Sequence, residues 1–380
     1  MQRNKNIEAM RGIAMIMMLF YHYTKIIEGI MVTNFANIVD EVICQTALIT
    51  FFVISGFGTF LALEKKCEKG ENITLFGFFK NRIKKIMPHY YFCIGVILIT
   101  TGTGYFAWAN LKAILAYVLC VQNIFPSVSG AINGATWTIA VMVQFYLIAV
   151  PMYKLVKRFG IKYYIGTLVF SQICKKVLCG IVAANGYPEV YYVIACMRQL
   201  FTTIDLFVAG MCAAMIYNKL KNRAEEISAI KYGTICTGIF ILLEVGFVAC
   251  IYIVGGMYGN GFKYYIWAPT TGILISTIAV FFAQMPFTYE SWLGRVIQFV
   301  AHNEYGTYLW HMVIILNFAS QSSIYHHLQT KAPVLLLILM MILACLIGFI
   351  STVLTDSPSY RAIFSCFKKK KDNDSEVVVD

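Results

Sequence analysis

The stretch IEAMRGIAMIMMLFYHYTKIIEG, Ile7–Gly29, decides the fold class of this chain. It is mostly apolar and long enough to cross a bilayer as a helix, which takes about 20 residues. Arg11 and His22 stand eleven positions apart, so they share one helix face and lie ~16 Å apart in depth. Ionisable side chains inside a membrane are costly and usually face a bundle interior or a cavity. The alternative is that Arg11 anchors the helix end and His22 is an ordinary packing residue.

Composition extends this reading to the whole chain. Of 380 residues, 59% are hydrophobic and 13% are charged, whereas about a quarter of the residues in a soluble domain are charged. The twelve cysteines are scattered singly, which is typical of small apolar membrane residues rather than of a disulfide or zinc framework. We therefore predict an all-α polytopic membrane protein that contacts membrane lipids, with no metal site and no nucleic-acid partner.

Ten apolar segments are predicted to cross the membrane. They are Ile7–Gly29, Glu41–Leu63, Pro88–Trp108, Trp137–Leu155, Lys162–Ala184, Met197–Tyr217, Tyr232–Gly255, Tyr264–Gln284, Ile297–Ala319 and Pro333–Leu354. An eleventh apolar stretch, Leu111–Val121, is too short to cross. Together these segments predict one integral membrane domain, residues 1–367. A disordered cytoplasmic tail, residues 368–380, is expected to follow it because that segment is basic and then acidic.

Loop charges favour ten crossings over eleven. Basic clusters occur at Lys80–Lys85, Lys154–Lys157, Lys219–Arg223 and Lys368–Lys371. If Leu111–Val121 does not cross, all four clusters lie on the side of the N-terminus, so both termini are predicted to be cytoplasmic in a multi-pass cell-membrane protein. Leu111–Val121 then becomes a re-entrant or interfacial segment on the outer side. Lys175 and Lys176 do not fit this pattern, and either snorkel outward or line a cavity.

Two predicted helices carry groups that invite close contact. Ser55, Gly56 and Gly58 form a patch of small residues, where either a neighbouring helix packs tightly or a ligand chain approaches. Trp137 and Gln144 are seven residues apart and share a face of the fourth helix. Gln144 falls near the middle of the membrane, where a buried amide requires hydrogen-bond partners.

Further polar groups line up with Arg11 and His22. The basic run Lys80–Lys85 precedes Pro88, and it binds either anionic lipid head groups or the phosphates of a cytosolic cofactor. On the ninth predicted helix, Glu304, Tyr308 and His311 follow an i, i+4, i+7 stripe. If that helix runs outward, His311 reaches a depth similar to that of His22. Two histidines at one depth, with Arg and Glu nearer the cytoplasm, indicate a polar path.

The order of these segments resembles the acyltransferase-3 family of integral membrane acyltransferases. That family opens with an acid–x–x–Arg–Gly segment and a following His. The matching residues here are Glu8, Arg11, Gly12 and His22, then Phe51–Phe57, then Arg82, Lys85 and Pro88, then Trp137, Val141 and Gln144–Tyr146, and finally Tyr308–His311. Lys85 stands where Arg is commoner in the family. The resemblance covers nearly the whole chain.

The resemblance implies transfer of an acyl group, usually acetyl from cytosolic acetyl-CoA, to a sugar hydroxyl on a surface or exported glycan or a lipid-linked sugar. It implies that Arg11, Arg82 and Lys85 hold the CoA phosphates, and that the extended pantetheine arm reaches toward His22. Histidine suits the general base because its ordinary pKa is about 6.5. Direct attack and a transient acyl-histidine both remain open. Arg11, Glu304 and His311 are expected to assist catalysis, and Trp137, Gln144 and Tyr308 to contact substrate.

One departure from the family pattern concerns an acid. Met142 stands where family members commonly carry Glu, so a carboxylate that orients a catalytic group must come from elsewhere, for instance Glu304 or Asp205. A catalytically silent relative is therefore one alternative. A secondary transporter with an intramembrane His and carboxylate relay is another. The family often fuses an esterase-like domain after the membrane part. Because this sequence ends at Asp380, transfer is expected to be completed by the membrane unit alone or with a separate partner.

Overall fold

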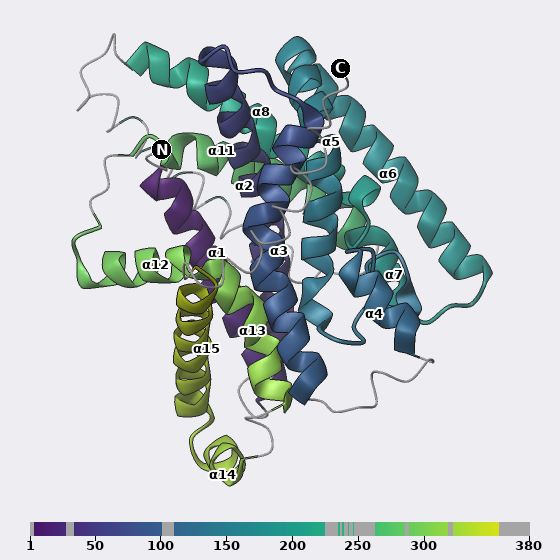
Figure 1. Cartoon of the computed structure of the whole chain (residues 1–380), viewed down its shortest axis with the longest axis vertical. Coiled ribbons are helices and arrows are strands. Elements are labelled where there is room, and N and C mark those ends of the chain that lie inside the picture. Colours follow the sequence, from purple (N-terminus) through teal and green to yellow (C-terminus); the bar gives the residue numbers. More distant parts are fainter. Residues whose placement is uncertain are drawn as a thin grey trace, which may run out of the picture.

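The computed structural model describes residues 4–27, 34–100, 110–224, 263–285, 289–317 and 322–356, with four single positions between 235 and 246. No β strand occurs in these ranges. The α-helices are α1 (Lys5–Ile26), α2 (Asn34–Glu68), α3 (Leu75–Thr100), α4 (Leu111–Val118), α5 (Trp137–Phe159), α6 (Ile161–Ala184), α7 (Glu189–Met197), α8 (Leu200–Ala224), α11 (Ala268–Phe282), α12 (Trp292–His302), α13 (Glu304–Asn317), α14 (Ser323–Lys331) and α15 (Pro333–Asp356). Short 3-10 turns η3 (Pro126–Val128) and η4 (Gly134–Thr136) precede α5, and a π-helical turn, η5 (Lys263–Trp267), precedes α11. Figure 1 shows the helices gathered into one bundle with α6 at one edge and α12 at the other.

The helices α2 and α8 form the closest crossing of the bundle. A Cβ atom added at Gly56 would lie 2.0 Å from the carbonyl oxygen of Phe207, and one added at Gly210 would lie 1.9 Å from that of Val53. Small residues at both helices therefore let the two backbones touch. Of the two readings open for the small patch on this helix, Gly56 serves tight helix packing.

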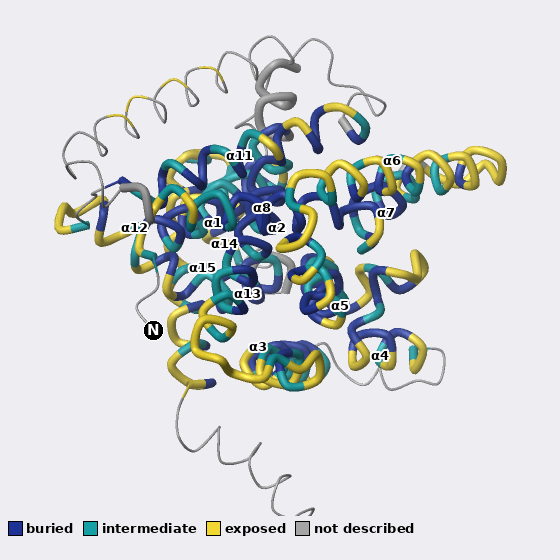
Figure 2. Tube along the Cα trace, turned by 90° about the horizontal axis from the view of Figure 1, so that it is seen from above, coloured by how far each residue is buried: buried dark blue, intermediate teal, exposed yellow. Residues whose placement is uncertain are grey.

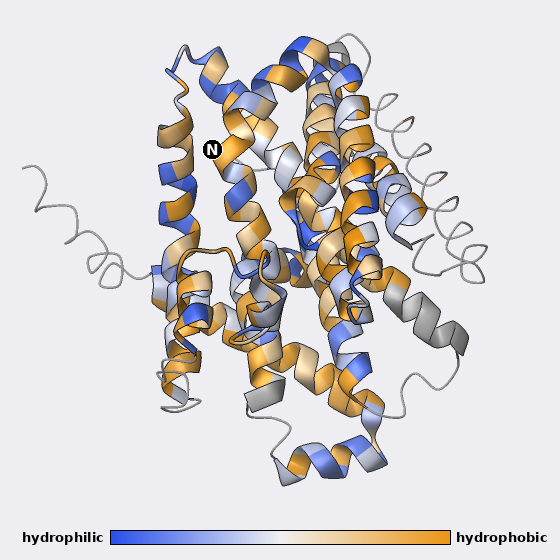
Figure 3. Cartoon of the chain, turned by 90° about the vertical axis from the view of Figure 1, so that its right-hand side faces the viewer, coloured by the Kyte–Doolittle hydropathy of each residue, from blue (hydrophilic) through white to orange (hydrophobic). Residues whose placement is uncertain are grey.

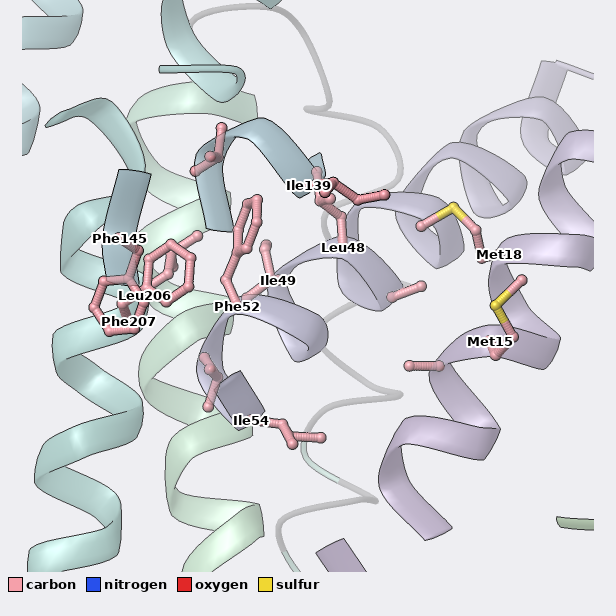
Figure 4. Packing of buried hydrophobic residues seen from close by; sticks show 14 of the residues in the cluster. Met15, Met18, Leu48, Ile49, Phe52, Ile54, Ile139, Phe145, Leu206 and Phe207 are labelled. Atoms are coloured by element: carbon pink, nitrogen blue, oxygen red, sulfur yellow. The ribbon is translucent and has the colours of Figure 1, made fainter. Parts of the chain in front are cut away.

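The core lies where α1, α2, α5 and α8 meet (Figure 4). Phe145 of α5 stacks on Phe207 of α8 with ring centroids 4.0 Å apart, and Phe52 of α2 lies 5.0 Å from the same ring. All three rings are buried. Offset aromatic contacts of this kind add to the energy of burial, so they hold α5 in a fixed position beside the central pair.

The outer helices present hydrophobic side chains outward. On α6 a stripe at three- and four-residue spacing is exposed, and a similar stripe runs along α15. Figure 2 shows α6 exposed along most of its length, and Figure 3 shows hydrophobic residues along the whole of the long helices. A soluble surface would not carry such bands. Lipid is the solvent that fits them.

Among the described residues, six helices are long and apolar enough to cross a membrane. They lie at Val42–Glu68, Gly134–Phe159, Ile161–Ala184, Leu200–Lys221, Tyr264–Phe282 and Pro333–Asp356. α1 and α3 are as long but carry charged residues in their N-terminal halves. The chain is therefore an all-α, multi-pass membrane protein. The seventh predicted segment, Tyr232–Gly255, lies outside the described residues except for four single helical positions, and the predicted tail lies entirely outside them.

The basic clusters that the structure describes gather at one end of the bundle. Asn4, just before α1, donates a hydrogen bond to the Tyr217 hydroxyl near the end of α8, at 3.3 Å. Lys157, near the end of α5, lies 3.1 Å from Glu64 of α2. The start of α1 and the ends of α2, α5 and α8 therefore share this end, which we call the basic end. The first half of α3 extends toward it as well, because Arg82 contacts Tyr146 of α5.

The third and ninth predicted membrane segments differ from the helices in the structure. The third was expected to begin at Pro88, but α3 begins at Leu75 and runs through the basic run and through Pro88. A membrane helix tolerates an internal proline because groups on neighbouring helices can satisfy the backbone carbonyl that loses its hydrogen bond. The ninth, expected to be continuous, breaks at Asn303 into α12 and α13. α12 exposes hydrophobic residues along one face, as an interfacial helix does.

Differences also occur on either side of α7. The sixth segment was expected to begin at Met197, but Met197 ends α7, and α8 begins only at Leu200. Arg198 and Gln199 form the junction between α7 and α8.

Two further predictions concern α4 and α6. The stretch expected not to cross contains α4, whose eight residues span only about 12 Å. Lys175 points into the bundle, where it is 2% exposed and donates to the Tyr264 carbonyl, whereas Lys176 is exposed.

Candidate active site

Charged residues from three helices meet toward the basic end. Arg11 of α1 and Glu304 of α13 form an ion pair, with Nη1 and Oε1 3.3 Å apart and both side chains partly buried. The Arg82 guanidinium of α3 lies over the Tyr146 ring at 5.4 Å. The Tyr146 hydroxyl is within electrostatic reach of Arg82, Arg11 and Glu304. The cluster therefore holds two guanidinium groups and one carboxylate, which is paired with Arg11, and it keeps a net positive charge.

Two neighbours of this cluster refine the sequence prediction. Gly58 of α2 lies beside Arg11, because a Cβ added there would be 3.6 Å from Nη2. This member of the small-residue patch thus faces a guanidinium rather than a neighbouring helix backbone. Lys85 is exposed on α3, so the structure places it at the surface of the basic end rather than against Tyr146. Its predicted contact with a cofactor stays a prediction.

The two predicted histidines meet as a pair. The rings of His22 on α1 and His311 on α13 lie 5.0 Å apart between centroids. His311 is fully buried, and its Nδ1 lies 2.7 Å from the Tyr308 carbonyl oxygen. Because a carbonyl can only accept, Nδ1 carries the proton, and in the neutral ring Nε2 holds a lone pair. That Nε2 is buried and makes no hydrogen bond to any described residue.

Tyr308 holds the pair against the start of α5. Its hydroxyl donates to the carbonyl of Ala135 in η4. The Tyr308 oxygen also lies 2.6 Å from the Thr138 hydroxyl, and since the phenol has only one proton, Thr138 is the donor in that contact. Tyr308 therefore fixes α13 to α5 one turn before His311.

The predicted need of Gln144 for partners is met by a residue that the sequence did not single out. Gln144 Nε2 donates to Asn123 Oδ1 at 2.8 Å, and Asn123 Nδ2 lies 3.3 Å from Gln144 Oε1. Asn123 also donates to the Arg198 carbonyl and accepts from Gln199. The segment after α4 thus enters the bundle and joins α5 to the junction between α7 and α8.

Trp137 meets that same junction. The Arg198 guanidinium carbon lies 5.3 Å from the centre of the Trp137 ring, and Arg198 Nη1 donates to the Ser129 hydroxyl at 3.1 Å. Trp137 and Gln144 share a face, as their spacing predicts, and that face is turned to the α7–α8 junction. The sequence analysis did not single out Arg198, because a single cation beside an apolar segment is usually a residue that anchors the end of a membrane helix. The pair Arg198-Gln199 between two apolar runs was the available signal.

The comparison with known families decides the class of this site. The acyltransferase-3 family model, described as an acyltransferase domain, matches residues 4–353. The chain belongs to the acyltransferase-3 family. The match spans both the basic end and the histidine pair, so the residues described above lie inside the acyltransferase domain.

Curated relatives of this chain come from Staphylococcus aureus. Proteins of strains COL, MSSA476 and MRSA252, each named "Putative O-acetyltransferase", are 24% identical over 298 residues. The aligned region covers 70% of this chain and 45% of each relative, so the chain spans less than half the length of the relatives that it matches. No solved structure matches the chain significantly.

The structure separates the two candidates for the acid missing at Met142. Glu304 contacts Arg11, so it lies beside the cationic cluster and on the helix that carries His311. Asp205 accepts from Ser171 of α6 and lies within reach of Lys175, in a cluster between α6 and α8. His311 is oriented by the Tyr308 carbonyl rather than by a carboxylate. Met142 packs against the hydrophobic core.

Proposed function

We propose that this acyltransferase moves an acetyl group from cytosolic acetyl-CoA to a sugar hydroxyl on a surface or exported glycan or on a lipid-linked sugar. The observation that carries the proposal is the His22–His311 pair, which lies on the same two helices as the Arg11–Glu304 ion pair. A cationic end and a basic nitrogen deeper in one bundle are the two parts that such a transfer needs.

The cationic cluster fits the phosphates of CoA. Arginine binds phosphate through paired N–H donors, and Arg11 and Arg82 together exceed the charge of Glu304. Acetyl-CoA supplies the activated acyl group as a thioester. Arg11 and His22 are eleven residues apart on α1, about 16 Å along the helix, a span that suits an extended pantetheine arm. The basic end would then face the cytoplasm, as the positive-inside rule predicts.

The histidine pair is suited to act as the general base. His311 offers a buried Nε2 lone pair whose orientation is fixed by the Tyr308 carbonyl. His22 is next to it and partly exposed, so an acceptor hydroxyl can reach His22 more readily than His311. The pair would take the proton that the hydroxyl loses and return it to the leaving thiol.

The test uses the purified protein in lipid nanodiscs with acetyl-CoA and candidate sugar acceptors. Release of free CoA thiol, together with the mass shift of an added acetyl group on the sugar, is expected from the wild type and not from His22→Ala. Absence of thiol release with every acceptor would overturn the proposal. In that case, proton-dependent solute uptake into proteoliposomes would favour the transporter alternative, and no uptake would favour a silent relative.

A further inference from the structure

The junction between α7 and α8 places one arginine fork beside the candidate active site. Arg198 Nη1 donates to Ser129, and the Trp137 ring supports the guanidinium plane. The backbone is fixed as well, because Asn123 donates to the Arg198 carbonyl at 2.8 Å. The guanidinium is therefore held from two sides rather than free to rotate.

One donor of this side chain has no partner among the described residues. Arg198 Nε is buried and makes no hydrogen bond to any described residue. Nη1 donates to the carbonyl and to the hydroxyl of Ser129. In the part of the chain that the structure describes, no carboxylate forms an ion pair with Arg198. The Nε and Nη2 edge is the one that meets a carboxylate or phosphate with two parallel hydrogen bonds.

The position of Arg198 assigns that edge to the acceptor rather than to the acyl donor. Arg198 lies near Tyr308, which is one turn before His311. It also stacks on Trp137, the first residue of α5, whereas Arg82 contacts Tyr146 farther along the same helix, toward the basic end. A donor held by Arg11 and Arg82 would approach the histidine pair from the opposite direction.

We propose that the acceptor sugar carries an anionic group, a carboxylate or a phosphate, and that Arg198 binds it through this edge. The inference rests on the proposed acetyl transfer. A partly buried guanidinium without an acid is costly, and the charge of the bound acceptor would offset that cost. Sugar hydroxyls alone would need only neutral donors and acceptors, which the neighbouring Asn, Ser and Thr side chains could provide. Arg198 is therefore a residue that determines acceptor specificity.

The experiment compares three acceptors: a disaccharide that contains glucuronic acid, the same disaccharide with its carboxyl group reduced to an alcohol, and the reduced disaccharide carrying a phosphate. Wild type, Arg198→Gln and Arg295→Gln are assayed, the last being a control because Arg295 is exposed on α12. We expect Arg198→Gln to raise the KM for the preferred charged acceptor by roughly 10- to 100-fold. The KM for the neutral acceptor and for acetyl-CoA should stay unchanged, as should all values in Arg295→Gln. The charged acceptor that wild type prefers identifies the anion as carboxylate or phosphate.

Equal acceptor KM values in wild type, or a preference that survives in Arg198→Gln, would overturn the inference. Arg198→Lys is the second variant, because it keeps the charge for folding but lacks the planar fork, and full retention of the preference there would also count against it. Thermal unfolding with each acceptor reports binding without turnover. If no variant releases thiol, yet the charged acceptor stabilises wild type and not Arg198→Gln, the acceptor site stands and the transferase proposal fails.

Discussion

At the scale of single residues, the contact between His22 and His311 is the decisive one. We expect His22→Ala to abolish acetyl transfer, and His311→Gln to lower kcat by about 10²- to 10⁴-fold, the range that a general base contributes. The KM for acetyl-CoA should change little, because neither ring lies in the Arg11 and Arg82 cluster. Thiol release by purified protein measures both quantities, and His326→Ala on the exposed α14 is the control. Substantial activity in His22→Ala would remove it as the base.

The cationic cluster yields a second prediction at this scale. Arg82 lies against Tyr146, which is also near Arg11 and Glu304, whereas Lys85 is exposed. Arg82→Ala should therefore raise the KM for acetyl-CoA by roughly 10- to 100-fold, as loss of a charge-assisted contact does, and Lys85→Ala by less. The KM for the acceptor should not change in either variant. If the KM for acetyl-CoA stayed constant in both, the basic run would bind lipid head groups instead.

The sequence predicted these residues unevenly, for a physical reason. Arg11 with His22, and Glu304 with His311, each lie on one helix, and helical spacing alone places them on one face. The sequence also predicted that His22 and His311 reach a similar depth, and the structure adds that their rings are in contact. Asn123 instead pairs with Gln144 through a loop that enters the bundle. No periodicity reports such a contact, because it depends on how the segment after α4 folds back.

At the scale of elements, the α2–α8 crossing depends on residues without side chains. Gly56→Ala would place a methyl group 2.0 Å from the Phe207 carbonyl oxygen, so the helices must separate. We expect a loss of stability of about 1–3 kcal/mol, the usual cost of overpacking. Gly166→Ala on α6 is the matched control, since nothing lies within 4 Å of a Cβ at that position. Thermal unfolding in detergent compares the two, and equal midpoints would contradict the observed crossing.

Helix boundaries were harder to predict than helix existence. Mean hydropathy does not reveal the helix breaks at Asn303 and at the Arg198-Gln199 junction, because one or two polar residues barely change the mean of a long apolar window. Both breaks are set by tertiary contacts. Asn303 ends α12 with a backbone bond to Phe299, and Gln199 donates to the Asn123 carbonyl at 2.7 Å. These contacts become visible only when the helices are packed together.

At the scale of the whole molecule, charge asymmetry is expected to set the orientation. The basic residues at the ends of α5 and α8 share the basic end with the start of α1. Cytoplasmic loops of membrane proteins carry an excess of Lys and Arg. The acetyl-CoA site proposed at this end would then open to the compartment that contains the donor, and the Arg198 edge would face the outer side.

Cysteine labelling tests this orientation directly. In a variant whose native cysteines are replaced, single cysteines placed in Lys80–Lys85, Lys154–Lys157 and Lys219–Arg223 should resist a membrane-impermeant maleimide in intact cells and react after permeabilisation. Cysteines placed in residues 187–192 and 256–261 should react in intact cells. Retained acetyl transfer is the control for folding of each variant. Labelling of Lys154–Lys157 from outside would mean that Leu111–Val121 crosses the membrane after all. The eight-residue α4 would then have to be part of a longer span, and the acyl donor would have to enter from the opposite end of the bundle.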